Sequence, residues 1–586
     1  MKKLLYAIAV SGLLISCGNN QQTNNSQSAN GDNAFKSLSD TFISGYLKWR
    51  PELAISVGFH DYDGRSSDLS KPSLDAEFNR LKQYDEKLSA IDTASLSLRA
   101  FYDFRILRNA VKNELFNFEG LHVYSRNPIY YAYAADLSIY IKRNFAPLEQ
   151  RLQYLISVEK NLPTVFSIAK QNLQDTLAKP LVQTAIEVAG GYISFMKKDL
   201  LIALKDIQND TLMTTFKKAN DSAIAAVNDY IQWLKTQRLS HADNNYAIGK
   251  ENYQKMLMYS EDISMSPDEI LAIGLKELKK EQDEFNAAAK IINPNKKPID
   301  VYHDMQKEHS TADSLIPDAK RHLENIRQFV IDKKIITIPS DVRVQVKETP
   351  EYARSTSTAS MDMPGPFEKK ATESYYYITP VDLKWNAKQK EDWLSMFDYY
   401  TTDNVSVHEA YPGHYVQGLH LNASDATAIE KIFGSYAFIE GWAHYCEKMM
   451  IEEGWCNNGD SITAAKYHLA QSGDALLRIC RLCVSIKMHC QGMTLDEGTK
   501  FFMDNWYQGE KPSYQEALRG TFDPGYLFYT VGKLEILKLR EDYKQQEGSN
   551  YSLMKFNDAV NDNGMPPIRL LRERLLKDKS KWVEVL

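Results

Sequence analysis

Two histidines six residues apart, with proline and glycine between them, constrain how one segment of this chain can fold. The segment reads His408-Glu409-Ala410-Tyr411-Pro412-Gly413-His414. Six residues turn an α-helix through roughly 240° net, so the two rings would point in different directions on a regular helix. Proline removes a backbone donor, and glycine tolerates unusual dihedral angles. We therefore expect a two-residue bulge at Pro412-Gly413 that returns His414 to the face of His408. The alternative is a pair of unrelated histidines near a helix end.

A second cluster of polar residues begins 26 positions after His414, with Glu440-Gly441-Trp442-Ala443, and runs to Glu447. Glu440, His444 and Glu447 follow i, i+4, i+7 spacing, so they share one helical stripe. Two histidines and a glutamate can hold zinc and leave one position for water. Glu409, beside the first histidine, is then placed to accept a proton from that water. We predict a Zn²⁺ site formed by His408, His414 and Glu440, with Glu447 as the alternative third ligand.

These motifs, H-E-x-x-P-G-H at 408–414 and E-G-W-A at 440–443, resemble those of the bacterial family called domain of unknown function 885. The segments 51–70 and 524–533 are also similar to that family, so the resemblance spans nearly all of the chain beyond its leader. The motif site is similar to those of helical zinc peptidases. This implies a mostly α, two-lobed fold and hydrolysis of short peptides. Tyr415 and Ser485 depart from the family pattern, where we expect histidine and aspartate.

The peptidase resemblance directs attention to further side chains that could act on a substrate. Hydrolysis produces an oxyanion that needs a hydrogen-bond donor. Similar peptidases take this donor from a late segment, which makes Tyr526 and Tyr529 candidate catalytic residues. A substrate carboxylate needs a cationic partner. The candidates are Arg478, Arg481, Arg519 and Lys533, and structural ion pairing is the alternative for each of them.

The first residues predict export and lipid attachment. Residues 1–17 begin with Met1-Lys2-Lys3, continue through an apolar run and end in Leu14-Ile15-Ser16-Cys17, which resembles a bacterial lipobox. Cys17 would carry the lipid. An ordinary signal peptide is the alternative, whereas the apolar run is too short to cross a bilayer. Residues 18–34 are polar and low in complexity, so we expect a flexible tether. The predicted location is the cell envelope, at the periplasmic face of the outer membrane.

Charge and cysteine content narrow the possible functions. The net charge is −6 without an extended basic patch, which argues against nucleic-acid binding. The five cysteines beyond Cys17 lie between 446 and 490, and an odd number in one region makes a poor disulfide framework. Cys480 and Cys483 lie in a helical pattern, so core packing is the favoured interpretation of this pair.

The pattern along the chain is mostly helical. Ser266 to Glu269 and Thr494 to Glu497 read as capping boxes at helix starts. A break at Asn293-Pro294 to Pro298 separates a predicted N-terminal helical lobe, 35–296, from a catalytic helical lobe, 297–586. Strand signals occur at 342–346 and 374–378, just before the histidine motif. We expect a small β-sheet there, either holding an extended peptide or forming only a structural hairpin.

The leading functional hypothesis is a lipid-anchored zinc metallopeptidase of carboxypeptidase or dipeptidase type, with Glu409 as the general base. One alternative is a helical nutrient-binding lipoprotein without catalysis. Another is a zinc hydrolase of non-peptide amides or esters. The two motifs favour an enzyme over a binding protein, because a binding protein has no need of Glu409.

Replacing Cys17 with alanine should prevent lipid attachment, because the thiol is the acylated group, and release the protein from the membrane. Metabolic lipid labelling followed by cell fractionation measures both effects. Lipid label on the Cys17→Ala protein, or a wild-type protein found wholly in the soluble fraction, would contradict the lipoprotein assignment.

Overall fold

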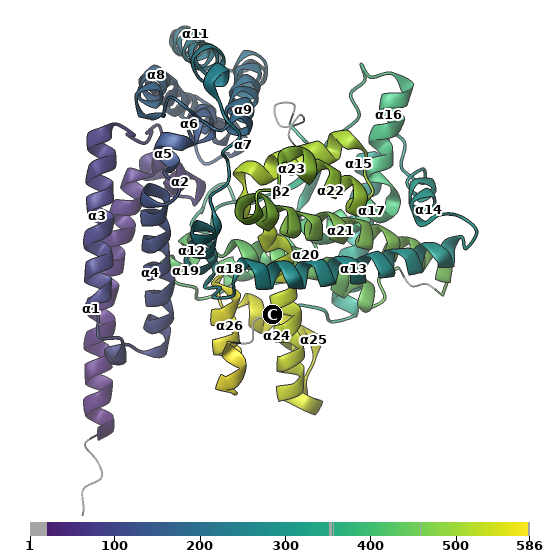
Figure 1. Cartoon of the computed structure of the whole chain (residues 1–586). Coiled ribbons are helices and arrows are strands. Elements are labelled where there is room, and N and C mark those ends of the chain that lie inside the picture. Colours follow the sequence, from purple (N-terminus) through teal and green to yellow (C-terminus); the bar gives the residue numbers. More distant parts are fainter. Residues whose placement is uncertain (1–19, 351–353, 355–356, 457–458, 584–585) are drawn as a thin grey trace, which may run out of the picture.

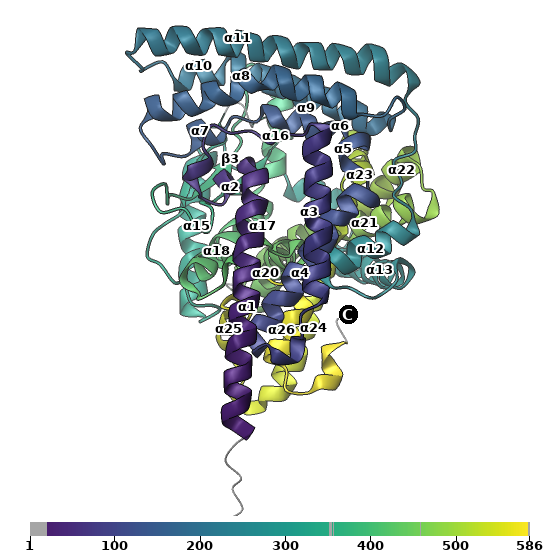
Figure 2. The same cartoon turned by 90° about the vertical axis from the view of Figure 1, so that its left-hand side faces the viewer.

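A computed structural model describes residues 20–350, 354, 357–456, 459–583 and 586, with side chains from residue 31 onward. The chain folds into helices with a small three-stranded sheet, which confirms the predicted mostly α, two-lobed fold. Figures 1 and 2 show a layer of helices lying across the top of the molecule, and a second group standing along one side. The leader 1–17, including Cys17, lies outside the described residues.

The upright group at the side contains the first four helices. They are α1 (Asn20–Trp49), α2 (Pro51–Ser56), α3 (Lys71–Ser89) and α4 (Leu98–Glu119). The predicted flexible tether at 18–34 is wrong from Asn20 onward, because α1 already begins there. Once the buried part of α1 has formed a helix, each residue added to its N-terminal end gains one backbone hydrogen bond, so the helix extends into the polar segment. The carboxylate of Asp32 also accepts the backbone N–H of Ser97 at 2.8 Å, which fixes this part of the helix.

The upper layer is a bundle dominated by α8, α9 and α11, with shorter helices at its lower surface (Figure 2). Its members are α5 (Val123–Arg126), α6 (Pro128–Ala132), α7 (Ile139–Lys142), α8 (Leu148–Asn172), α9 (Lys179–Lys197), α10 (Asp199–Ala203) and α11 (Asp210–Trp233). Leu155, Val182 and Val227 contribute to a continuous hydrophobic core between these helices. The layer therefore has a core of its own.

The predicted lobe boundary at 297 does not coincide with the change in packing. The next helices are α12 (Lys250–Glu261), α13 (Pro267–Ile292), α14 (Pro298–Met305) and α15 (Leu315–Asp332). Helix α13 begins at the predicted capping box and runs along α21 (Ser461–Gln491). A Cβ atom at Gly274 would overlap Leu482, so the two helices approach closely there. Residues before the turn at 293–297 thus belong to the core of the second lobe, because they share its buried residues.

The sheet lies beside the histidine motif, as expected. Its strands are β1 (Gln345–Glu348), β2 (Ala359–Asp362) and β3 (Tyr375–Ile378), in the order β1-β3-β2. Strand β3 pairs with β1 in parallel and with β2 in antiparallel orientation. The strand predicted at 342–346 starts later, and Val342 is exposed in the preceding loop. Strand β2 escaped prediction because Ala-Ser-Met-Asp has no β-branched or aromatic residue.

The remaining helices surround the two motifs. They are α16 (Ala387–Leu394), α17 (Tyr399–Glu409), α18 (His414–Ala423), α19 (Ala428–Ile432), α20 (Tyr436–Glu452), α22 (Leu495–Trp506), α23 (Glu510–Phe522), α24 (Phe528–Glu547), α25 (Leu553–Asn561) and α26 (Ile568–Leu575). Helix α20 packs on α24 through two glycines. Cβ atoms at Gly441 or Gly532 would overlap the backbone of the opposite helix. This close contact fixes the position of α20, which carries Glu440.

The chain breaks between the two histidines instead of bulging. Helix α17 ends at Glu409, and α18 begins at His414. The Tyr411-Pro412 peptide bond between them is cis. The backbone N–H of Gly413 donates to the Val407 carbonyl at 3.0 Å, so the linking segment folds back on α17. The two-residue bulge that we predicted is therefore wrong in form, although both histidines still reach one site.

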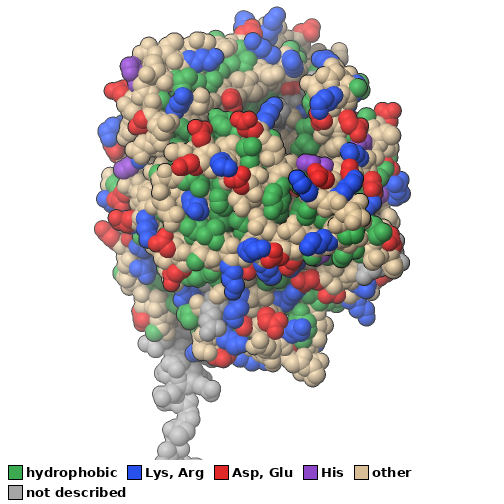
Figure 3. All heavy atoms as spheres, turned by 45° about the vertical axis from the view of Figure 1, so that its right-hand side comes forward, with side chains coloured by type: hydrophobic (Ala, Val, Ile, Leu, Met, Phe, Trp, Pro, Cys, Tyr) green, Lys and Arg blue, Asp and Glu red, His purple; other side chains and the backbone are tan. Residues whose placement is uncertain are grey.

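The distribution of charge on the surface agrees with the small net charge of the sequence and its lack of an extended basic patch. The face drawn in Figure 3 carries interspersed acidic and basic side chains with scattered hydrophobic ones. Within the described part of the chain, no helix combines the length and the hydrophobicity needed to span a bilayer.

Replacing Gly413 with alanine should destabilise the protein. The added Cβ atom would overlap the carbonyl oxygen of His408, and backbone cannot yield as a side-chain tip can. We expect a cost of about 1–3 kcal/mol, measured as a lower melting temperature in the presence of chelator. Gly190→Ala in α9 is the control, because its Cβ would meet nothing within 4 Å. Equal melting temperatures for Gly413→Ala and wild type would contradict a tightly packed break.

Candidate metal centre

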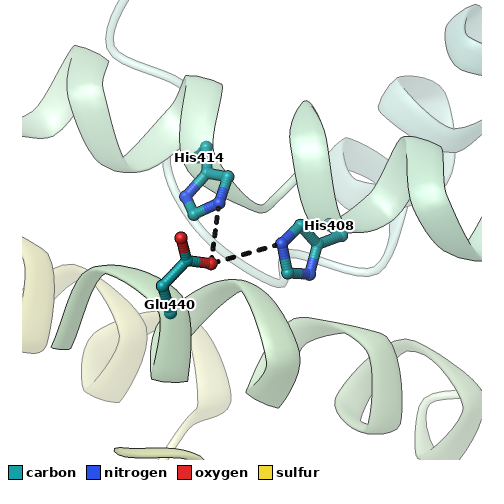
Figure 4. Close-up of side chains that lie close together, drawn as sticks. All are labelled: His408, His414 and Glu440. Carbon is teal, nitrogen blue, oxygen red and sulfur yellow. Dashed lines mark ion pairs between the residues drawn. The ribbon is translucent and has the colours of Figure 1, made fainter. Parts of the chain in front are cut away.

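Three side chains from three helices converge at the break. His408 comes from the last turn of α17, His414 is the first residue of α18, and Glu440 projects from α20. Figure 4 shows both imidazoles directed at the same carboxylate oxygen. The Oε2 atom of Glu440 lies 3.6 Å from His408 Nε2 and 3.5 Å from His414 Nε2. One potential ligand atom from each residue lies within 4.8 Å of the others. All three residues predicted to bind metal are thus brought together.

The donor set and its spacing fit a zinc ion. Zinc takes neutral imidazole nitrogens and carboxylate oxygens at about 2.0–2.2 Å, so two ligands of a tetrahedral ion lie about 3.3 Å apart. The two nitrogen–oxygen separations exceed that value by only a few tenths of an ångström. Burial raises the pKa of Glu440, but His408 and His414 outweigh burial and hold the pKa well below its usual value. Glu440 is therefore anionic, as a zinc ligand must be.

Glu447 stands behind His408 and acts on its other ring nitrogen. The Nδ1 atom of His408 lies 2.7 Å from Glu447 Oε1, which leaves Nε2 facing Glu440. Such a hydrogen bond fixes the ring orientation and the tautomer of a metal-binding histidine. Glu447 Oε2 lies 3.1 Å from Nδ1 of the buried His444. Glu447 therefore orients His408, whereas Glu440 is the carboxylate that clusters with both histidines.

The charge of Glu447 is balanced by α21. Arg478 NH2 lies 3.3 Å from Glu447 Oε1, and Asp474 forms a second ion pair with Arg478. Asn404 Nδ2 donates to Asp474 at 2.7 Å. Burial raises the pKa of Glu447, but Arg478 and His444 outweigh burial and hold it well below its usual value. Arg478 thus serves this network, which is the structural ion pairing given above as the alternative for this residue.

Glu409, the predicted general base, points at the sheet. Its Oε2 atom accepts the backbone N–H of Met361 in β2 at 2.9 Å. That N–H consequently faces away from β3. Because backbone groups of alternate residues point to the same edge in an antiparallel pair, Ala359 and Met363 also present groups to this free edge. Glu409, which follows His408 directly, therefore contacts the edge of β2 that no other strand of the described residues pairs with.

The structure separates the two predicted tyrosines. Burial raises the pKa of Tyr529, and the charge of Glu440 adds to that rise. The buried hydroxyl of Tyr526 instead lies against Gly520 and has no hydrogen-bond partner among the described residues. Tyr436, which the sequence reading missed, packs on Tyr529 with ring centroids 5.8 Å apart. Its position one helical turn before Glu440 was the available signal.

Other histidines and cations are held in structural roles. His420 contacts Asp562 and the Thr337 carbonyl, and His489 contacts the Gly520 carbonyl, so neither reaches the three ligands. Arg481 makes two hydrogen bonds to Glu516, at 2.7 and 2.8 Å. Lys533 is buried, and burial lowers its pKa. Of the three arginines predicted as carboxylate binders, Arg519 has the most exposed side chain, at 32%.

Replacing Glu447 with glutamine should weaken zinc binding without abolishing it, because the ligand His408 loses its orienting carboxylate. We expect about a 10- to 100-fold loss of affinity, measured by titration against a competing chelator. Glu430→Gln is the matched control, since Glu430 is also buried and paired with an arginine, Arg574. Complete loss of zinc in Glu447→Gln, with normal binding in Glu440→Gln, would show that Glu447 is the ligand.

Two solved structures share this fold. A candidate lipoprotein of unknown function from Shewanella oneidensis has a TM-score of 0.78 at 25% identity, covering 93% of this chain and 100% of that chain. A candidate lipoprotein from Colwellia psychrerythraea has a TM-score of 0.78 at 16% identity, covering 94% and 99%. The latter likeness concerns the fold alone. No curated protein matches the chain.

A family model described as a bacterial protein of unknown function matches residues 51–575. This span contains both motifs and far more than half of the sequence. The chain therefore belongs to the DUF885 family of bacterial proteins.

Proposed function

We propose that this protein is a zinc-dependent peptidase that hydrolyses short peptides. The observation that carries the proposal is the convergence of His408, His414 and Glu440, with their ligand atoms within 4.8 Å, next to Glu409. Two imidazoles, one carboxylate and an adjacent second carboxylate match the parts of a zinc hydrolase site.

Each protein group has a role in this proposal. When bound, zinc would polarise the substrate carbonyl and make the attacking water more acidic. Glu409 would take the proton from the water and later pass it to the leaving amine. Tyr529, which packs on Tyr436 one helical turn before Glu440, would donate a hydrogen bond to the developing oxyanion. Glu447 would keep His408 in the productive ring orientation.

The surroundings of the site favour a peptide that is short and extended. The side chains of His408, His414 and Glu440 are only 7%, 16% and 18% exposed, so a folded protein surface cannot reach them closely. The free edge of β2, next to Glu409, offers backbone groups at Ala359 and Met363. An extended peptide can add to such an edge as a further strand. The edge would therefore align a peptide bond with the three ligands.

We further propose attachment to the envelope through lipid on Cys17, at the periplasmic face of the outer membrane. The lipobox-like segment supports this location, and both structural relatives are described as candidate lipoproteins. A peptidase at this place would meet short peptides that cross the outer membrane.

Zinc analysis tests the ligand set. About one zinc ion per chain should bind, as such sites hold one ion. His408→Ala, His414→Ala and Glu440→Ala should each lose it. His420→Ala is the control, because His420 lies outside the site. Full zinc content in any of the three variants would remove that residue from the ligand set.

Glu409→Gln tests the chemistry separately from binding. Glutamine keeps the shape of the side chain but cannot take a proton, so zinc should be retained while turnover of a short-peptide library falls about 100-fold or more. Mass spectrometry of the digests, with and without chelator, measures the loss. A Glu409→Gln protein that hydrolyses peptides at the wild-type rate would refute the proposed mechanism.

A further inference from the structure

Arg519 is an accessible cation at the rim of the metal centre. It lies in α23, and its guanidinium is bound on one side by Asp523, which is 27% exposed. Arg519 Nε donates to Asp523 Oδ2 at 3.0 Å, and NH2 donates to the hydroxyl of Tyr436 at 3.2 Å. These bonds do not use the NH1 donors. A guanidinium has five N–H donors in all, so Asp523 orients the group without exhausting it.

Two tyrosines connect Arg519 to the metal ligands. Tyr436 is four residues before Glu440 in α20, and residues at this spacing lie one above the other, about 5–6 Å apart at Cβ. The guanidinium also lies 5.8 Å from the ring centroid of Tyr529, which packs on Tyr436 with ring centroids 5.8 Å apart. Arg519 therefore contacts a tyrosine that lies one helical turn from Glu440, which is one of the three clustered residues.

The upper layer of helices lies next to α23, the helix that carries Arg519. Tyr133, in the short helical turn η3 (Tyr133–Ala135), is 56% exposed. Burial raises the pKa of Tyr133, Asp136 and Asp523 add to that rise, and Arg519 opposes it. Helix α23, which carries Arg519, packs against α9 of this layer. Arg519 consequently lies between the two lobes, surrounded by phenols that can also donate hydrogen bonds to an anion. Arg478 and Arg481, with side chains 11% and 10% exposed, pair with the buried Glu447 and the half-buried Glu516, respectively.

We propose that Arg519, with Tyr436 and Tyr529, binds the free C-terminal carboxylate of the peptide, so that the enzyme removes one or two residues from chain ends. This inference rests on the proposed peptidase function and names its substrate class. A guanidinium fork matches a carboxylate in geometry and charge. An internal peptide bond carries no charge and gains no such contact. The site would thus distinguish chain ends from chain interiors.

The test compares two random tripeptide libraries with the same sequences, one with free C-terminal acids and one with C-terminal amides. The zinc-loaded, full-length Glu409→Gln protein is mixed with each, and retained peptides are measured by mass spectrometry after ultrafiltration. Acids should be retained preferentially. The double variant Glu409→Gln, Arg519→Gln should bind the acids about 10- to 100-fold more weakly, which is the loss in affinity expected when one charged hydrogen-bonded pair is removed. Its binding of the amides should be nearly unchanged.

Arg540→Gln is the matched control. Arg540 also pairs with one glutamate, Glu452, and one tyrosine, Tyr445, and neither of these partners belongs to the proposed site. It should retain acids as before. An Arg519→Lys variant should recover part of the acid retention, since the charge remains and the fork is lost. Matching melting temperatures would show that the variants are folded.

The outcomes separate this inference from the proposed function. Selective retention of acids without cleavage by the wild-type protein would refute the peptidase but support the carboxylate site. Cleavage of acids and amides at equal kcat/KM, or an equal effect of Arg519→Gln on both libraries, would refute the carboxylate site alone. Retention of amides rich in Asp or Glu would assign Arg519 to acidic side chains and overturn the chain-end assignment. Retention of neither library would overturn the inference.

Discussion

The hydrogen bond from the Trp442 indole to the Pro412 carbonyl, 3.0 Å long, joins the two motifs of this chain. It holds the break between α17 and α18 against α20, the helix that supplies Glu440. The break itself is close-packed, because Gly413 leaves no room for a side chain next to the His408 carbonyl. On its other side, α20 meets α24 through Gly441 and Gly532. Two imidazoles and a carboxylate from three helices can converge only because this chain of contacts fixes all three backbones.

Behind the ligands, buried charges compensate one another. Glu447 is fully buried, yet it stays anionic because Arg478 and His444 surround it. Removing one member of such a group would leave an unpaired buried charge, which costs several kcal/mol. The network thus gives a rigid support for the imidazole of His408. A loosely held imidazole would lose conformational entropy whenever a metal ion binds, which would weaken binding. The imidazole of His408 is already ordered by its hydrogen bond to Glu447.

The groups that we propose to meet a substrate are arranged differently. Glu409, the free edge of β2, Tyr529 and Arg519 come from different parts of the chain and retain accessible donors or acceptors. Arg519 and Arg478 illustrate the contrast. Both are arginines from the late helices, but the first is 32% exposed between the lobes and the second is locked to buried carboxylates. Exposure, and not residue type, separates the cation that can meet a ligand from the one that supports the site.

The sequence alone indicated the helical class and the three residues, His408, His414 and Glu440, whose potential ligand atoms the structure brings together. It could do so because spacing within one helix and the chemistry of imidazole and carboxylate are local properties. The capping boxes at Ser266 and Thr494 gave true helix starts for the same reason. Only the tertiary structure decided the rest. It showed a helix break where we expected a bulge, a helix through 20–34 where composition predicted a tether, and α13 in the second lobe. It also separated Tyr529 from Tyr526 and Glu440 from Glu447. These distinctions depend on which surfaces pack together across hundreds of residues, and no local pattern records that packing.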